Sequence, residues 1–266
     1  MAYERLKVEV GAVSVVGLSR PEVRNALDAL AFREIADCFH RLSEDERVRV
    51  VVLRAEGKDF CAGADISWMR EAGLLQGEAA RKDASLVAGM CLAVAGCRAP
   101  VVARVHGSVF GGGLGLLAAC DIVVAEASSR MCFSECRLGV APAVISPFVL
   151  PKIGASFALR YYLTSKPFGM DEAVRMGLVH EAVPVAELDA RVDAVVADIL
   201  RNGPGAVAEA KALIRKLASP DLDGQVSRCL DVLVRVRSTA EAQEGLKAFL
   251  DGRPASYAAS GAQPKG

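Results

Sequence analysis

The pattern of apolar and polar positions divides the chain into strand-like segments followed by a long helical region. Leu6–Val16 is rich in β-branched residues and predicts a strand with a hairpin near Gly11. Continuous apolar runs at Val48–Leu53 and Pro100–Val105 are typical of strands buried on both faces. Shorter runs predict strands at Ile122–Val124 and Leu178–Val183.

Helical periodicity fills the intervals between these strands and dominates the second half of the chain. Strand–helix alternation followed by helices predicts an α/β core with a helical C-terminal region. We therefore divide the chain into a core, residues 1–198, and a helical region, residues 199–266, whose tail from Ser256 is expected to be frayed. Helices are expected at Leu27–Leu42 and Gly113–Cys120, and helical patterns run from Asp65 to about Cys97. From Ala155 onward the chain is mostly helical, with long helices expected at Ala186–Leu200, Ala206–Leu217 and Asp223–Leu250.

Composition narrows the class of protein. The 266 residues carry 32 basic and 32 acidic side chains, so no overall charge favours nucleic acid or an anionic membrane. Charged residues interrupt the N-terminal MAYERLKVEV, which resembles neither a signal nor a transit peptide. Apolar stretches broken by Asp121, Pro142 and Pro147 are too short to span a bilayer. With eight cysteines and no leader, we expect a cytoplasmic protein with reduced thiols.

A glycine cluster at residues 111–115, FGGGLGLLAACD from Phe110, is the most unusual local feature. Each glycine inside a helix costs about 1 kcal/mol relative to alanine, so four together require a reason. The cluster lies between a predicted strand and a predicted helix, where unpaired N–H groups and the helix dipole attract negative charge. Close packing of the helix against a strand is the simpler explanation for a single glycine, but not for four.

Several known types of glycine-rich or cysteine-rich binding site are excluded because the neighbouring residues that they require are missing. A P-loop needs Lys-Ser/Thr after the glycines, and Leu114-Gly115-Leu116 follows here. A dinucleotide fingerprint would open the first βαβ unit, and a lipase-like oxyanion loop would need a GxSxG elbow. Cys132 and Cys136 have no second pair or nearby histidine, so no metal site is expected. An oxyanion hole for a thioester carbonyl remains.

A second segment, Lys58–Ile66 with the sequence KDFCAGADI, joins the glycine cluster in a recognisable order of motifs. With Arg20-Pro21, Arg24–Leu27 and His106–Asp121, it resembles the crotonase (enoyl-CoA hydratase/isomerase) family. The resemblance covers nearly the whole chain and includes Phe133–Pro142, Gly177–Val179 and Phe249–Pro254. It implies an α/β spiral of ββα units, a C-terminal helical trimerisation region, and a homotrimer or dimer of trimers.

The resemblance also implies a binding site for acyl-CoA, with no separate cofactor because coenzyme A is part of the substrate. The backbone N–H groups of Ala64 and Gly112 would hold the thioester oxygen, since both approach the carbonyl closely. Arg24 and Ala26 would lie near the CoA phosphates and adenosine, although Arg24 is also compatible with an ordinary surface cation. The adenine and pantetheine path would be lined by Ala62, Gly63, Asp65 and Ile66.

The acid–base group departs from the common form of the family. Hydratases of the family carry two glutamates, and this chain has Gly115 at the first position and Glu135 at the second. Apolar surroundings would raise the pKa of Glu135 and suit it to proton transfer. A solvated loop acid or a partner of Arg137 is the structural alternative for this residue.

A single glutamate permits either hydration of the C2=C3 bond or movement of the double bond between C3 and C2. The run Ser134–Phe148 and Gly115 resemble the subgroup that hydrates methylglutaconyl-CoA in leucine breakdown, or carboxygeranoyl-type substrates. Glycine at 115 would remove a charge that repels a distal substrate carboxylate and would open space for a branched chain. The other classes are a non-catalytic acyl-CoA-binding protein, disfavoured by Glu135, and a dinucleotide oxidoreductase, disfavoured by the missing fingerprint.

Overall fold

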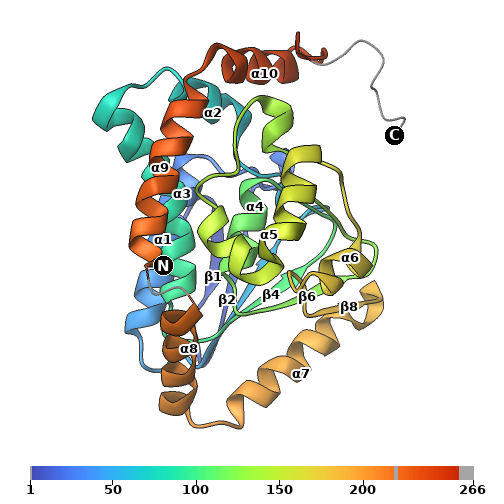
Figure 1. Ribbon diagram of the computed structural model, residues 1–266. Helices are drawn as coiled ribbons and strands as arrows, with labels where there is room; N and C mark the ends of the chain where they lie inside the picture. Colours follow the sequence, from blue (N-terminus) through green and yellow to red (C-terminus); the bar gives the residue numbers. More distant parts are fainter. Residues whose placement is uncertain (1, 219–220, 258–266) are drawn as a thin grey trace.

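A computed structural model describes residues 2–218 and 221–257 and contains a six-stranded sheet in the order β1-β2-β3-β4-β6-β8 (Figure 1). Strands β1 and β2 form the expected hairpin, and every later neighbour in the sheet is parallel. The sheet strands are β1 Leu6–Glu9, β2 Val13–Leu18, β3 Val50–Ala55, β4 Val101–Val105, β6 Ile122–Glu126 and β8 Glu181–Val183.

Helices cover both faces of this sheet, which explains why its central strands are continuously apolar. On β3, Val51 and Leu53 belong to the main core with residues of the long helices, whereas Val50 and Val52 pack with helix α7. The helices are α1 Ala29–Glu44, α2 Ile66–Ala72, α3 Gly77–Gly96, α4 Gly112–Ala119, α5 Ser146–Thr164, α6 Met170–Arg175, α7 Leu188–Leu200, α8 Pro204–Ala218, α9 Leu222–Arg237 and α10 Ala240–Leu250, with 3₁₀ turns η1 Pro21–Val23, η2 Glu135–Leu138 and η3 Val185–Glu187.

A second, two-stranded sheet was not predicted from the sequence. Strands β5 (Ser108–Phe110) and β7 (Arg130–Cys132) pair in parallel, with Phe110 opposite Cys132. Each strand has three residues, which is too short to give a periodic signal. Because paired parallel strands end at the same edge, the segments that follow them lie side by side. This pairing brings the glycine cluster next to Ser134 and Glu135.

The C-terminal region contains one more helix than the sequence predicted. The stretch expected as one helix is two, because Thr239 begins a new helix with its hydroxyl accepting a hydrogen bond from the N–H of Ala242 (3.2 Å). Helix α9 adds Val226, Leu230 and Leu233 to the main core. Helices α8 and α10 lie at opposite ends of the molecule (Figure 1).

The predicted boundaries can be compared with these elements. Residue 198, the expected end of the core, lies inside helix α7. The tail is held further than expected, because the N–H of Ser256 donates to Glu244 (2.9 Å) and the Tyr257 hydroxyl donates to the carbonyl of Arg137 (3.1 Å). The rest of the expected frayed tail lies outside the described residues. Among the described helices, none combines the length and apolar character needed to cross a membrane.

Candidate active site

The two backbone groups expected to hold a thioester oxygen lie close to each other. The Cβ position of Gly112 would be 3.6 Å from the backbone nitrogen of Ala64, with no other atom within 4 Å apart from its chain neighbours and the backbone of its own helix. Gly112 is the first residue of α4, where backbone N–H groups lack an intrahelical acceptor. Within the described chain, neither the Gly112 N–H nor the Ala64 N–H donates a hydrogen bond. Two free donors at a helix N-terminus can therefore share one oxygen ligand.

The loop before α2 fixes the position of Ala64. Gly63 has φ +97°, and a Cβ there would lie 2.9 Å from the carbonyl oxygen of Phe110, so this position requires glycine. Leu27 pairs with Ala64 as a parallel bridge, accepting from Asp65 and donating to Gly63 (2.9 and 2.8 Å). The loop is therefore anchored on both sides of the donor.

The four glycines of the cluster serve different purposes. Gly111 has φ +47°, and its Cβ position faces the carboxylate of Glu135 at 3.4 Å. A Cβ on Gly113 would lie 2.9 Å from Sγ of Cys61, and one on Gly115 would lie 2.2 Å from Cγ2 of Ile145. Close packing thus explains Gly113 and Gly115. Only Gly112 faces the space next to Ala64.

Glu135 begins the 3₁₀ turn η2, directly after β7 and Ser134. Its carboxylate oxygen Oε2 is buried and has no hydrogen-bond partner, although the residue as a whole is only half-buried. Burial raises the pKa of Glu135 from 4.5 to about 7. The solvated-acid alternative is therefore wrong for this residue. The alternative pairing also fails, because the Arg137 guanidinium donates to the carbonyl of Ser165 (2.6 Å).

Helix α10 packs on the turn that carries Glu135. A Cβ at Gly139 would lie 2.8 Å from the carbonyl oxygen of Glu241, and one at Gly245 would lie 2.5 Å from the carbonyl oxygen of Leu138. These approaches to backbone atoms leave the turn little freedom to move. The C-terminal helices therefore help to hold the acid in place.

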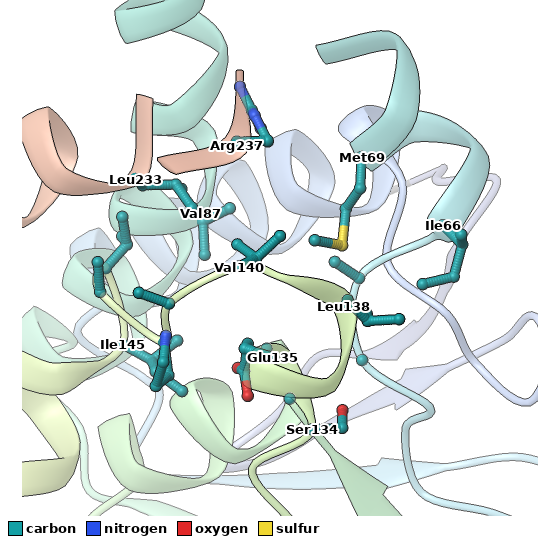
Figure 2. A pocket seen from close by; sticks show the side chains of 18 of the residues that line it. Ile66, Met69, Val87, Ser134, Glu135, Leu138, Val140, Ile145, Leu233 and Arg237 are labelled. Atoms are coloured by element: carbon teal, nitrogen blue, oxygen red, sulfur yellow. The ribbon is translucent and has the colours of Figure 1, made fainter. Parts of the chain in front are cut away.

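A cavity joins the oxyanion donors to Glu135 (Figure 2). Of the expected site residues, Ala62, Gly63, Ala64, Ile66, Gly112 and Glu135 line it. Four others, Arg24, Ala26, Asp65 and Gly115, do not. Lining residues that sequence reasoning did not assign to the site include Trp68, Met69, Val87, Ser134, Leu138, Val140, Ile145, Leu233 and Arg237.

The structure corrects the role predicted for Gly115. Glycine there was expected to open space for a branched substrate, but the side chain of Ile145 fills that space. Gly115 is buried behind Ile145, which itself lines the cavity. Among the lining residues described, Glu135 is the single acid.

The residues expected along the CoA path have partners within the protein. Arg24 is half-exposed beside the ring of Phe110, and its Nε donates to Asp59 (2.6 Å). The Ala26 carbonyl accepts from Arg20 (2.8 Å). The carboxylate of Asp65 caps α2 by accepting from the N–H of Ser67 (3.0 Å) and lies 3.5 Å from Arg20. These contacts give the Asp65 carboxylate a structural role, and contacts of Arg24, Ala26 and Asp65 with CoA remain predictions.

The geometry agrees with comparisons to known proteins. The family model for enoyl-CoA hydratase/isomerase matches residues 9–260. Crotonyl-CoA hydratase of Syntrophomonas wolfei is 30% identical over 260 residues, covering 97% of this chain and 99% of that protein. The crystal structure of an enoyl-CoA hydratase from Mycobacterium avium has 36% identity and a TM-score of 0.84, with 96% and 99% of the two chains covered.

The chain therefore belongs to the enoyl-CoA hydratase/isomerase family, and the crotonase fold and the expectation of an enzyme are confirmed. The short-chain-enoyl-CoA hydratase of Clostridium acetobutylicum is a further relative, 30% identical over 245 residues and covering 91% of this chain and 93% of that protein. In residues 2–218 and 221–257, no group of three or more His, Cys, Asp or Glu side chains could hold a metal ion.

Proposed function

We propose that the protein adds water across the C2=C3 double bond of an enoyl-CoA, using Glu135 as its single acid–base group. The observation that carries this proposal is the buried, unpartnered Oε2 of Glu135 in the same cavity as the free N–H groups of Ala64 and Gly112. A carboxylate oxygen with no internal partner is available for a proton, and a pKa of about 7 lets the carboxyl gain and lose that proton near neutral pH.

In this mechanism the thioester oxygen accepts hydrogen bonds from Ala64 and Gly112. Negative charge grows on that oxygen as water attacks C3, and removing one such donor typically costs about 2.7–4 kcal/mol of transition-state stabilisation. Ionised Glu135 takes a proton from the attacking water while the hydroxyl bonds to C3. The carboxyl then returns a proton to C2 on the same face, which restores the thioester and the ionised glutamate.

The acyl group we propose is branched and carboxylated, of the methylglutaconyl type found in leucine breakdown. The resemblance around Gly115 and Ser134–Phe148 supports this, as does a lining with a single carboxylate. A second acid would repel a distal carboxylate on the substrate.

Isomerisation is the alternative, because one glutamate can also move a proton between C2 and C4. Crotonyl-CoA, a 3-enoyl-CoA and 3-methylglutaconyl-CoA, each assayed for water addition and for double-bond movement, separate the two reactions. We expect the parent to form the 3-hydroxyacyl product and Glu135→Gln to lose this activity. Double-bond movement without hydration in the parent would favour isomerisation.

We also propose self-association as a homotrimer or a dimer of trimers. Helix α8 buries no residue within the described chain, and Leu213, Ile214 and Leu217 on it are between 58% and 73% exposed. A second copy that covers this face would remove those side chains from water. Sedimentation equilibrium of the parent and of Ile214→Glu tests this, with dissociation expected in the variant.

A cytoplasmic location is our proposal for the compartment. All eight cysteines are free thiols and six of them are buried, which is typical of a reducing environment. Fractionation of cells that produce the protein checks the location directly.

A further inference from the structure

We infer that Arg237 is a specificity-determining residue, which binds an anionic group at the far end of the acyl chain. The inference deepens the proposed function, on which it rests. Arg237 is the last residue of α9, is 1% exposed, and lines the same cavity as Glu135. In Figure 2, Arg237 is drawn above Glu135, with Val140 between them in the view.

Internal contacts hold the guanidinium of Arg237 but leave one of its N–H donors without a partner. Its Nη2 donates to Oδ2 of Asp83 (2.9 Å), and its Cζ lies 5.4 Å from the centre of the Trp68 ring. The indole N–H of Trp68 donates to the other oxygen of Asp83 (3.1 Å). Nε of Arg237 is buried without a hydrogen-bond partner. Both oxygens of Asp83 are thus engaged, one by Arg237 and one by Trp68, and Nε of Arg237 is left without an acceptor within the described chain.

A purely structural ion pair explains these features less well. Helices α3 and α9 are already joined by Arg81, which pairs with Asp231 and donates to Ser227 (2.8 Å) at their exposed surface. Burial of a charged guanidinium is costly, and an unsatisfied N–H adds to that cost. Burial also lowers the pKa of Arg237. A cation placed at the cavity wall in spite of this cost is understandable if a ligand completes its hydrogen bonds.

The chemistry of the cavity identifies the ligand class. Among its described lining residues, Glu135 and Arg237 are the two charged side chains, and the wall otherwise includes apolar residues such as Val87 and Leu233. An acyl chain whose reacting carbons lie by Glu135 and whose terminal carboxylate reaches Arg237 would match this order of charges. Guanidinium has five donors in one plane and can serve Asp83 and a second carboxylate together.

The test compares two substrates that differ only in the carboxylate, 3-methylglutaconyl-CoA and 3-methylcrotonyl-CoA. In Arg237→Met we expect kcat/KM to fall about 10- to 100-fold for the first, mainly through KM, and to stay within about 3-fold for the second. Arg237→Gln, which can still donate to Asp83, should show the same change of preference and provides a second variant if Arg237→Met does not fold. Arg81→Met is the matched control, because it removes an arginine between the same two helices outside the cavity.

The outcomes separate this inference from the proposed function. If the parent prefers the carboxylated substrate and a folded Arg237 variant keeps that preference, the role of Arg237 is overturned and the proposed function stands. A parent that hydrates both substrates equally would overturn it as well, together with the carboxylated substrate class. A parent that hydrates neither would overturn the proposed function. An equal loss for both substrates in Arg237→Met and Arg81→Met would assign Arg237 a structural role only.

Discussion

Ile145 occupies the position that any side chain at residue 115 would enter. The Cβ position of Gly115 lies 2.2 Å from Cγ2 and 2.7 Å from Cβ of Ile145. Both atoms are close to the backbone of a β-branched residue, so they cannot turn aside by a simple rotamer change. The absence of a glutamate at 115 and the presence of isoleucine at 145 are therefore one structural feature, which makes this wall of the cavity apolar.

This contact changes what a substitution at Gly115 is expected to do. Alanine has a higher helix propensity than glycine. Gly115→Ala should nevertheless lower the free energy of unfolding by about 1–3 kcal/mol, because the added methyl overpacks the core. Gly115→Glu should cost more, so it is not a clean test of substrate charge. Urea titration of the parent, Gly115→Ala, Ile145→Ala and the double variant measures the coupling between the sites. Additive effects of the two substitutions would contradict the proposed contact.

Replacing Glu135 by glutamine should abolish most of the turnover while leaving ligand binding intact. The amide keeps the volume but cannot accept the proton of water, so kcat should fall about 100-fold or more. Affinity for the unreactive acetoacetyl-CoA should change little, since it depends on the backbone donors. Initial rates and calorimetric binding measure the two effects. Near-normal turnover in the variant would remove Glu135 from the mechanism.

The pKa of Glu135 predicts opposite pH trends for activity and stability. Hydration needs the ionised carboxylate, so kcat/KM should rise with pH and level off above about pH 7. The folded state keeps the proton up to about pH 7, whereas the unfolded glutamate releases it near its ordinary pKa of 4.5. Because the folded state binds more protons between these values, stability should fall as pH rises through this window, by about 3 kcal/mol at most.

Glu135→Gln is the control for both trends, since it has nothing to titrate at this position. Denaturant unfolding of the parent and the variant between pH 4 and pH 8 should give curves that diverge above about pH 4.5. Parallel curves would mean that the carboxylate is solvated in the folded protein.

Gly112 and Gly113 should respond differently to the same substitution. Gly112→Val points a side chain into the space beside the Ala64 nitrogen, so acyl-CoA binding and rate should both fall while circular dichroism stays near normal. Gly113→Val meets Cys61, where even a Cβ would be 2.9 Å from Sγ, so it should lose stability instead. Thermal unfolding and steady-state kinetics separate the two. Unfolding of Gly112→Val would assign that glycine to packing.

The sequence by itself determined the elements whose signal is local and periodic. Apolar runs such as Val48–Leu53 predicted buried strands because both faces of a covered parallel strand are apolar. The helix–helix boundary at Thr239 was missed, although threonine is one of the residue types preferred at helix N-caps. The ordered motifs around Ala64, Gly112 and Glu135 identified the family and three residues that the structure brings to one cavity.

Tertiary structure alone decided which side chains meet across the site. Arg237 is more than 100 residues from Glu135, and nothing in its neighbourhood distinguishes it from the other arginine near the end of its helix, Arg235. Ile145 blocks Gly115 only because α5 and α4 pack together, and β5 and β7 are too short to be recognised before they pair. Periodicity reports whether a residue is buried, but the partner it meets depends on how distant segments pack, and that pairing decides the charge and shape of this cavity.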